Sequence, residues 1–294
     1  MFKSIGLFGV AALMTSVVSA GEPLTFTPVD SDDFVGEYYP GTQPGYGVMV
    51  VEGARGGMPD VLAQKIAATG YPVLSVAYFK ESGLPDKLEE LPLEYLQKPK
   101  QWLLAQSETR DDGLVMAGWS KGAELTLNTV ARDGDYKGAI AIAPTSVVWQ
   151  GRGAKGSAAS SWTYQGEPLA YLKWPKQTDL ESINEAVMAT LEEANWHEHP
   201  ARIPLENSQA QILLLSGGQD SVWPASAMAK QICEQMTVHL PEQCRHVDYP
   251  RAGHLLHDQV EMGGTKQANA EADEASSQEI MRFLETLNTP KRHP

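Results

Sequence analysis

The sequence predicts an α/β fold, with a mostly parallel sheet covered by helices on both faces. Short apolar runs rich in β-branched residues alternate with longer helical patterns along most of the chain. These runs are apolar throughout, as expected for strands buried on both faces. The chain has 294 residues, of which 42% are hydrophobic and 20% charged, which excludes a disordered protein. The alternation, which continues along most of the chain, is consistent with one domain over residues 21–294.

The predicted elements of the first half follow in order. Residues 24–27 and 34–39 alternate in polarity across a stretch of Asp and Ser, which predicts an antiparallel hairpin. Next come a buried strand at 47–51, a helix at 59–69 and a strand rich in β-branched and aromatic residues at 71–79. A helix is predicted at 93–106 with a break near Pro99, because proline disrupts a helix interior. A strand at 114–118 and a helix at 121–131 complete this half.

The second half contains the one interruption of the pattern. A strand is predicted at 138–143, but residues 144–208 begin rich in Gly and Ser and then contain only a helical stretch at 183–194. We expect this insertion to form a lid-like segment over the site. The alternation resumes with a strand at 211–215, a helix at 224–234, a strand at 245–249 and a helix at 278–287. The acidic stretch at 269–277 is expected to be the solvated start of that last helix.

The first twenty residues have the composition of a cleavable export signal. Lys3 is followed by an uncharged segment that ends in Val18-Ser19-Ala20. We expect cleavage after Ala20 and a secreted or periplasmic protein. The segment is short for a transmembrane anchor, which is the alternative.

The net charge of −14 limits the partners of the chain. Sequence-independent nucleic-acid binding requires a basic surface, and an acidic chain gains nothing from anionic membranes. We therefore expect no nucleic acid and no stable membrane association. The oligomeric state is left open, and no cofactor and no metal are expected.

Cys233 and Cys244 are the two cysteines of the chain. Neither their spacing nor their neighbours match a zinc or C-x-x-C pattern. In an exported protein, a disulfide that closes this short loop is the expected arrangement.

Gly118-Trp119-Ser120-Lys121-Gly122 is the one G-x-S-x-G in the sequence, and it lies between a predicted strand and a predicted helix. This is the context of a nucleophile elbow, in which the serine is held on a sharp turn at a helix N-terminus. Ser120 is the expected nucleophile. A serine that merely starts a helix is the alternative interpretation.

A serine hydroxyl requires a base, and the base requires an acid to orient it. His254 directly follows the last predicted strand, and Asp220 follows the strand before it. The order Ser120, Asp220, His254 is that of an α/β-hydrolase fold. His197 and His199 form an H-x-H pattern within the insertion and are expected at the surface. Asp220 could instead cap the next helix.

The second oxyanion donor is expected in the loop 52–57, which follows the first buried strand. Ala54 is the predicted donor from this loop, together with the backbone N–H of Lys121. A plain glycine turn is the alternative for the loop. Trp119 and Trp223 flank the nucleophile and the acid, where they line an acyl pocket or pack in the core.

These motifs together resemble the catalytic domain of the acyl-CoA thioesterase and bile acid-CoA:amino acid N-acyltransferase family. The resemblance covers about residues 46–287 and rests on several stretches: Val76-Ala77-Tyr78-Phe79, Gly118-Trp119-Ser120-Lys121-Gly122-Ala123-Glu124-Leu125, Tyr164-Gln165-Gly166-Glu167, Ile203-Pro204-Leu205-Glu206, Gly218-Gln219-Asp220-Ser221-Val222-Trp223-Pro224 and Gly253-His254. It implies a Ser120/Asp220/His254 triad that hydrolyses an acyl thioester.

The sequence differs from the family in three places. No stretch matches the N-terminal β-sandwich domain of animal members. Arg55 occupies a loop that is a run of glycines in the family, and Leu255-Leu256-His257-Asp258-Gln259 replaces an aromatic, proline-rich segment. A serine nucleophile fits the hydrolase branch better than the acyltransferase branch.

Three functions remain open at the sequence level. The first is hydrolysis of a small-molecule acyl thioester or ester, the second a secreted carboxylesterase or lactone hydrolase, and the third a catalytically silent binding protein. Coenzyme A is a polyanion, so an acidic chain needs a local basic patch to attract it. Arg55, Lys121 and Arg251 are the residues from which such a patch is expected.

Overall fold

The computed structural model describes residues 24–152, 158–175, 182–237 and 242–289. The predicted export signal lies outside these residues. Within them, no helix is both long enough and apolar enough to cross a membrane.

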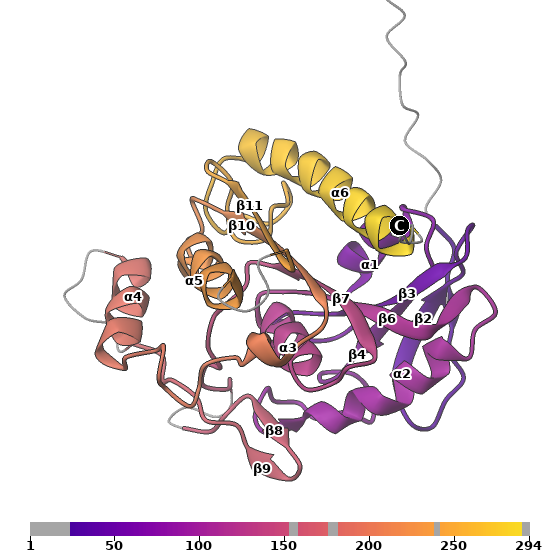
Figure 1. The fold of residues 1–294 in the computed structure, drawn as a ribbon, viewed down its shortest axis with the longest axis horizontal. Helices are drawn as coiled ribbons and strands as arrows, with labels where there is room; N and C mark the ends of the chain where they lie inside the picture. Colours follow the sequence, from indigo (N-terminus) through magenta and orange to yellow (C-terminus); the bar gives the residue numbers. More distant parts are fainter. Residues whose placement is uncertain (1–23, 153–157, 176–181, 238–241, 290–294) are drawn as a thin grey trace, which may run out of the picture.

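The molecule is built around one eight-stranded sheet (Figure 1). Its strands lie in the order β1-β2-β4-β3-β6-β7-β10-β11. All pairs from β4 to β11 are parallel, whereas β2 is antiparallel to both β4 and β1. The strand bounds are β1 Thr27–Pro28, β2 Val35–Tyr39, β3 Gly45–Val51, β4 Val73–Ala77, β6 Thr109–Trp119, β7 Tyr136–Ile142, β10 Gln211–Gly217 and β11 Cys244–Tyr249.

Helices cover both faces of this sheet, because alternate strand residues point to opposite sides. On one face, Val48 and Val50 pack with α1 (Asp60–Ala67) and α6 (Lys266–Asn288). On the other, Met49 and Val51 pack with α2 (Gln97–Leu104), α3 (Lys121–Val130) and α5 (Ala225–Thr237). The predicted α/β class is therefore confirmed.

Two predicted helices differ from the structure in detail. The expected break near Pro99 is wrong: a 3₁₀ turn, η1 (Leu93–Leu96), leads into α2, and Pro99 lies in the first turn of that helix. Backbone N–H groups there have no intrahelical acceptor, so proline costs little. The last helix begins at Lys266, where the Thr265 hydroxyl accepts a hydrogen bond from Ala268 N–H.

The insertion forms a separate group of small elements beside the sheet (Figure 1). It contains β8 (Trp162–Tyr164), β9 (Glu167–Pro168), α4 (Ile183–Glu193) and the 3₁₀ turn η2 (Leu205–Asn207), and β8 pairs with β5 (Leu91–Pro92). Some of its apolar residues, including those of α4, make a third core cluster with Trp223 and Met228, whereas Trp162 of β8 packs in the core cluster that contains Met49 and Val51. The insertion is thus packed directly against the segment that follows β10.

Candidate active site

The G-x-S-x-G segment forms the sharp turn between β6 and α3. Ser120 has a φ of 55° and a ψ of −122°, a strained conformation for a residue with a side chain. A Cβ on Gly118 would lie 2.4 Å from the Gly122 carbonyl oxygen, and a Cβ on Gly122 would lie 2.4 Å from that of Glu52. Glycine is therefore required at both positions, and the turn places Ser120 at the N-terminus of α3.

Asp220 follows the carboxyl end of β10 and His254 follows that of β11, and the two side chains meet there. The Asp220 carboxylate Oδ2 lies 2.7 Å from His254 Nδ1, and both side chains are only 2% exposed. The other oxygen, Oδ1, accepts backbone hydrogen bonds from Val222 at 2.8 Å and Trp223 at 3.1 Å. These two donors fix the orientation of the carboxylate, which in turn fixes the imidazole ring.

The outer nitrogen of His254, Nε2, is buried and has no hydrogen-bond partner among the described residues. The Ser120 hydroxyl is thus not bonded to it here. Catalytic hydrogen bonds of this kind are often long in ligand-free enzymes. Ser120 and His254 nevertheless line one cavity of about 660 Å³, and Asp220 lies behind His254.

The predicted oxyanion donors lie at the same cavity. Ala54 and Lys121 both line it. Lys121 is the first residue of α3, so its N–H has no acceptor within the helix. No acceptor is bonded to the Ala54 N–H within the described ranges. The arrangement leaves two backbone donors beside the serine.

The side chain of Lys121 takes part in a buried ion pair and does not reach the cavity as a free cation. Its ammonium donates to both carboxylate oxygens of Glu124 at 2.8 Å, and neither side chain is more than 3% exposed. Burial lowers the pKa of Lys121 and raises that of Glu124, and each charge partly offsets the shift of the other. Glu124 also accepts hydrogen bonds from Trp149 and Trp162, which tie the insertion to α3.

Several aromatic side chains line the cavity. Trp119 and Trp223 both line it, although they are 4% and 1% exposed. Trp174, from the insertion, stacks on Trp223 with ring centroids 5.9 Å apart and on Trp149 at 4.9 Å. Trp223 also meets the His254 ring edge-on at 5.5 Å. Trp174 was not predicted as a site residue, because it lies in an irregular segment without a periodic pattern or motif.

Basic residues form another part of the cavity lining, but the set differs from the one expected. Arg55 lines the cavity as predicted, together with Lys80 and Arg152. Arg251 is instead exposed and paired with Glu271 at 2.7 Å. Lys80 and Arg152 come from loops that sequence spacing does not connect to the serine.

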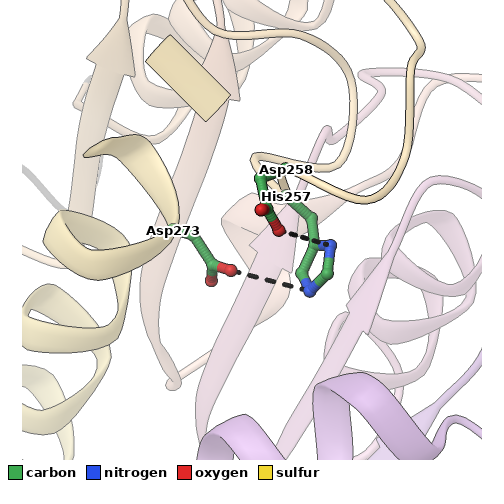
Figure 2. Close-up of side chains that lie close together, drawn as sticks. All are labelled: His257, Asp258 and Asp273. Atoms are coloured by element: carbon green, nitrogen blue, oxygen red, sulfur yellow. Dashed lines mark ion pairs between the residues drawn. The ribbon is translucent and has the colours of Figure 1, made fainter. Parts of the chain in front are cut away.

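His257, Asp258 and Asp273 lie close together beside the cavity, and Figure 2 shows each carboxylate facing a different nitrogen of the imidazole. His257 Nδ1 lies 3.8 Å from Asp258, whereas Nε2 lies 3.6 Å from Asp273. One candidate ligand atom from each of the three residues lies within 4.8 Å of the other two. Lys65 already pairs with Asp273 at 2.7 Å. The geometry is that of an ion-pair group.

The remaining predicted residues lie away from the cavity. Cys233 of α5 and Cys244 at the start of β11 are joined in a disulfide, with their Cα atoms 5.3 Å apart. The His197 ring packs on Trp196, and His199 Nδ1 accepts a hydrogen bond from Ala201 N–H. In the part of the chain that the structure describes, neither histidine belongs to a group of metal-ligating side chains.

Comparison with curated proteins gives relatives of one kind. The chain is 29% identical to mouse acyl-coenzyme A thioesterase 5 over 223 residues, covering 74% of this chain and 50% of the relative. It is 26% identical to mouse acyl-coenzyme A amino acid N-acyltransferase 1 over 264 residues, covering 83% and 60%. The chain thus spans roughly half the length of the curated relatives it matches.

Solved structures support the fold. An esterase from Pyrococcus furiosus matches with a TM-score of 0.56 at 13% identity, covering 92% of this chain and 97% of that one. A dienelactone hydrolase-like protein from Klebsiella pneumoniae matches with a TM-score of 0.57 at 16% identity, covering 87% and 97%. These likenesses confirm the α/β-hydrolase fold and nothing finer.

The family model of the BAAT / acyl-CoA thioester hydrolase C-terminal domain matches residues 91–258. This range is more than half of the chain and contains Ser120, Asp220 and His254. The resemblance expected from the sequence motifs is confirmed, and the chain belongs to the BAAT / acyl-CoA thioester hydrolase C-terminal family.

Proposed function

We propose that this chain is a serine hydrolase that cleaves acyl-CoA thioesters through an acyl-enzyme on Ser120. The observation that carries the proposal is the buried Asp220–His254 pair, 2.7 Å apart, behind a cavity that Ser120 also lines. A carboxylate held against a histidine beside an elbow serine is the arrangement that activates a hydroxyl.

The geometry supports a two-step reaction. Ser120 Oγ attacks the thioester carbonyl while its proton passes to His254 Nε2, and Asp220 stabilises the imidazolium that forms. The oxyanion accepts hydrogen bonds from the N–H groups of Ala54 and Lys121. Collapse breaks the carbon–sulfur bond, and His254 protonates the departing thiolate. Water, deprotonated by His254, then attacks the serine ester. The bond between the acyl carbon and Ser120 Oγ breaks, His254 returns the proton to Oγ, and the carboxylic acid leaves.

The cavity lining contains both apolar and basic side chains, which favours a substrate that combines an acyl group with an anionic group. The indoles of Trp119, Trp174 and Trp223 offer an apolar surface to an acyl group. The basic side chains of Lys80 and Arg152 offer positive charge to an anionic leaving group, whereas the charge of Arg55 is offset by Glu52. Coenzyme A, with its phosphates, is such a leaving group, and the relatives are named as proteins that act on acyl-coenzyme A.

The experiment compares Ser120→Ala with the parent protein on an acyl-CoA and on an uncharged p-nitrophenyl ester of the same acyl chain. Loss of the nucleophile should lower kcat at least about a thousandfold on both substrates, with an unchanged melting temperature. Residual activity within tenfold of the parent would refute the nucleophile. A folded parent that turns over neither substrate would favour a silent binding protein.

The salt dependence tests the leaving group. Added salt should raise KM for acyl-CoA and leave KM for the ester nearly unchanged, because screening weakens the attraction of the phosphates to Lys80 and Arg152. A strong preference for the ester, with equal salt responses, would instead indicate a carboxylesterase or lactone hydrolase.

A further inference from the structure

Glu52 is a buried acidic residue at the cavity for which the reaction above has no use. It is the first residue after β3, and Val51 pairs with Gly118 in the parallel register of β3 and β6. Glu52 therefore lies beside Trp119, the residue before the nucleophile. Its side chain is 4% exposed and lines the cavity.

The carboxylate of Glu52 joins the loop 52–57, which we call the oxyanion loop, to the nucleophile elbow around Ser120. Its Oε1 accepts hydrogen bonds from the indole N–H of Trp119 at 2.8 Å and from the Gly53 N–H at 3.0 Å. Its Oε2 accepts one from the guanidinium of Arg55 at 3.3 Å. Its backbone carbonyl accepts one from the hydroxyl of Tyr78 at 2.8 Å. One side chain thus contacts both segments that supply the expected oxyanion donors.

These bonds determine which N–H groups face the substrate. The Gly53 N–H is used by Glu52, whereas the next N–H along the loop, that of Ala54, has no bonded acceptor among the described residues. The loop also lies as close to the elbow as it can, since a Cβ on Gly53 would lie 3.0 Å from the Trp119 carbonyl oxygen. Oxyanion donors must be held in place before reaction to be effective.

The charge of Glu52 requires its own explanation, because a carboxylate near a developing oxyanion opposes the reaction. Arg55 supplies the opposite charge: its guanidinium contacts Glu52, and its side chain is 69% exposed at the cavity. The pair places no net charge beside the serine. Arg55, which departs from the family's glycine run, therefore has a local partner in this chain.

We propose that Glu52 is a positioning residue that fixes the oxyanion loop against the nucleophile elbow, leaving the Ala54 N–H as the donor that faces the substrate. This inference rests on the proposed function, since it assumes an oxyanion at Ser120. Glu52 acts through Gly53 and Trp119 and exchanges no proton with the substrate.

The test measures kcat and KM on an uncharged ester for Glu52→Ala and Glu52→Gln. Glu52→Ala should lower kcat on the order of a hundredfold, the effect of losing one oxyanion donor, while KM changes less than about threefold. Glu52→Gln keeps an acceptor for Trp119 and should recover kcat to within about tenfold of the parent. Glu81→Ala is the matched control, because the Glu81 carboxylate lies near the same loop, 3.3 Å from where a Cβ on Gly57 would be, but does not line the cavity.

Trp119→Phe is a second variant that tests the same proposal if Glu52→Ala fails to fold. Removing only the indole donor should lower kcat several-fold, and the double variant with Glu52→Gln should lose less than the product of the two single losses. An unchanged kcat in Trp119→Phe, or a kcat of Glu52→Ala within threefold of the parent, would overturn the proposal. Ser120→Ala, measured in the same assay, distinguishes failure of the Glu52 proposal from failure of the proposed function. If Ser120→Ala stays active, the proposed function itself is wrong.

Discussion

Replacing Asp220 by Asn tests the hydrogen-bond direction in the proposed triad. The backbone N–H groups of Val222 and Trp223 both donate to Oδ1. They require an acceptor, so the asparagine carbonyl must take that position and its NH₂ group must face His254. That NH₂ would donate to Nδ1, and the neutral histidine would then carry its proton on Nε2, where it cannot accept the proton of Ser120.

The expected effect of this wrong tautomer is large. Loss of histidine basicity in such triads lowers kcat by about 10⁴-fold, which corresponds to about 5.4 kcal/mol in the activation barrier. The two backbone hydrogen bonds survive, so the free energy of unfolding should change by less than about 2 kcal/mol. Steady-state hydrolysis of a chromogenic ester and thermal unfolding measure the two effects separately.

The matched control for Asp220→Asn is Asp258→Asn, the same substitution at a carboxylate beside His257 that does not line the cavity. It should keep kcat within about threefold of the parent. An Asp220→Asn protein with kcat within tenfold of the parent would refute the assignment of Asp220 as the residue that orients His254.

Three further predictions concern stability and processing. Denatured, unreduced protein should show no titratable thiol, and reducing Cys233–Cys244 should lower the free energy of unfolding by roughly 2–3 kcal/mol, measured in urea; two free thiols would contradict this. Glu124→Gln should destabilise the fold by about 3–5 kcal/mol in the same assay, because it leaves the Lys121 ammonium buried without its counter-ion; a loss below about 1 kcal/mol would contradict a buried ion pair. Protein exported by a bacterial host should begin at Gly21 by intact mass, and a full-length mass in the exported fraction would refute the predicted cleavage.

The fold was predictable because its signals are local. The apolar strands at 47–51 and 211–215 and the amphipathic helix at 121–131 show their type in their own residues, and the structure places β3, β10 and α3 there. The insertion was recognisable only as an interruption. Its small strands β8 and β9 have three and two residues, too few to show a periodicity, and β8 is held by pairing with the distant strand β5.

Some residues of the candidate site were also predictable from local signals, and others were not. Ser120, Asp220 and His254 were identifiable because each follows a predicted strand, and parallel strands bring their ends together. Glu52, Trp174 and Arg152 were not identified, since their roles depend on which loops pack against each other. Lys121 shows the limit most clearly: its charge was expected in a basic patch, but the i,i+3 spacing to Glu124 directs it into a buried pair.

Covalent labelling with a fluorophosphonate tests the central claim, that Ser120 is a nucleophile activated by His254. The parent protein should gain the mass of one phosphonyl group, and peptide mapping should place it on Ser120. Ser120→Ala should gain none, and His254→Ala should react far more slowly although it retains Ser120. An active parent protein that is not labelled, or labelled on a residue other than Ser120, would contradict the account.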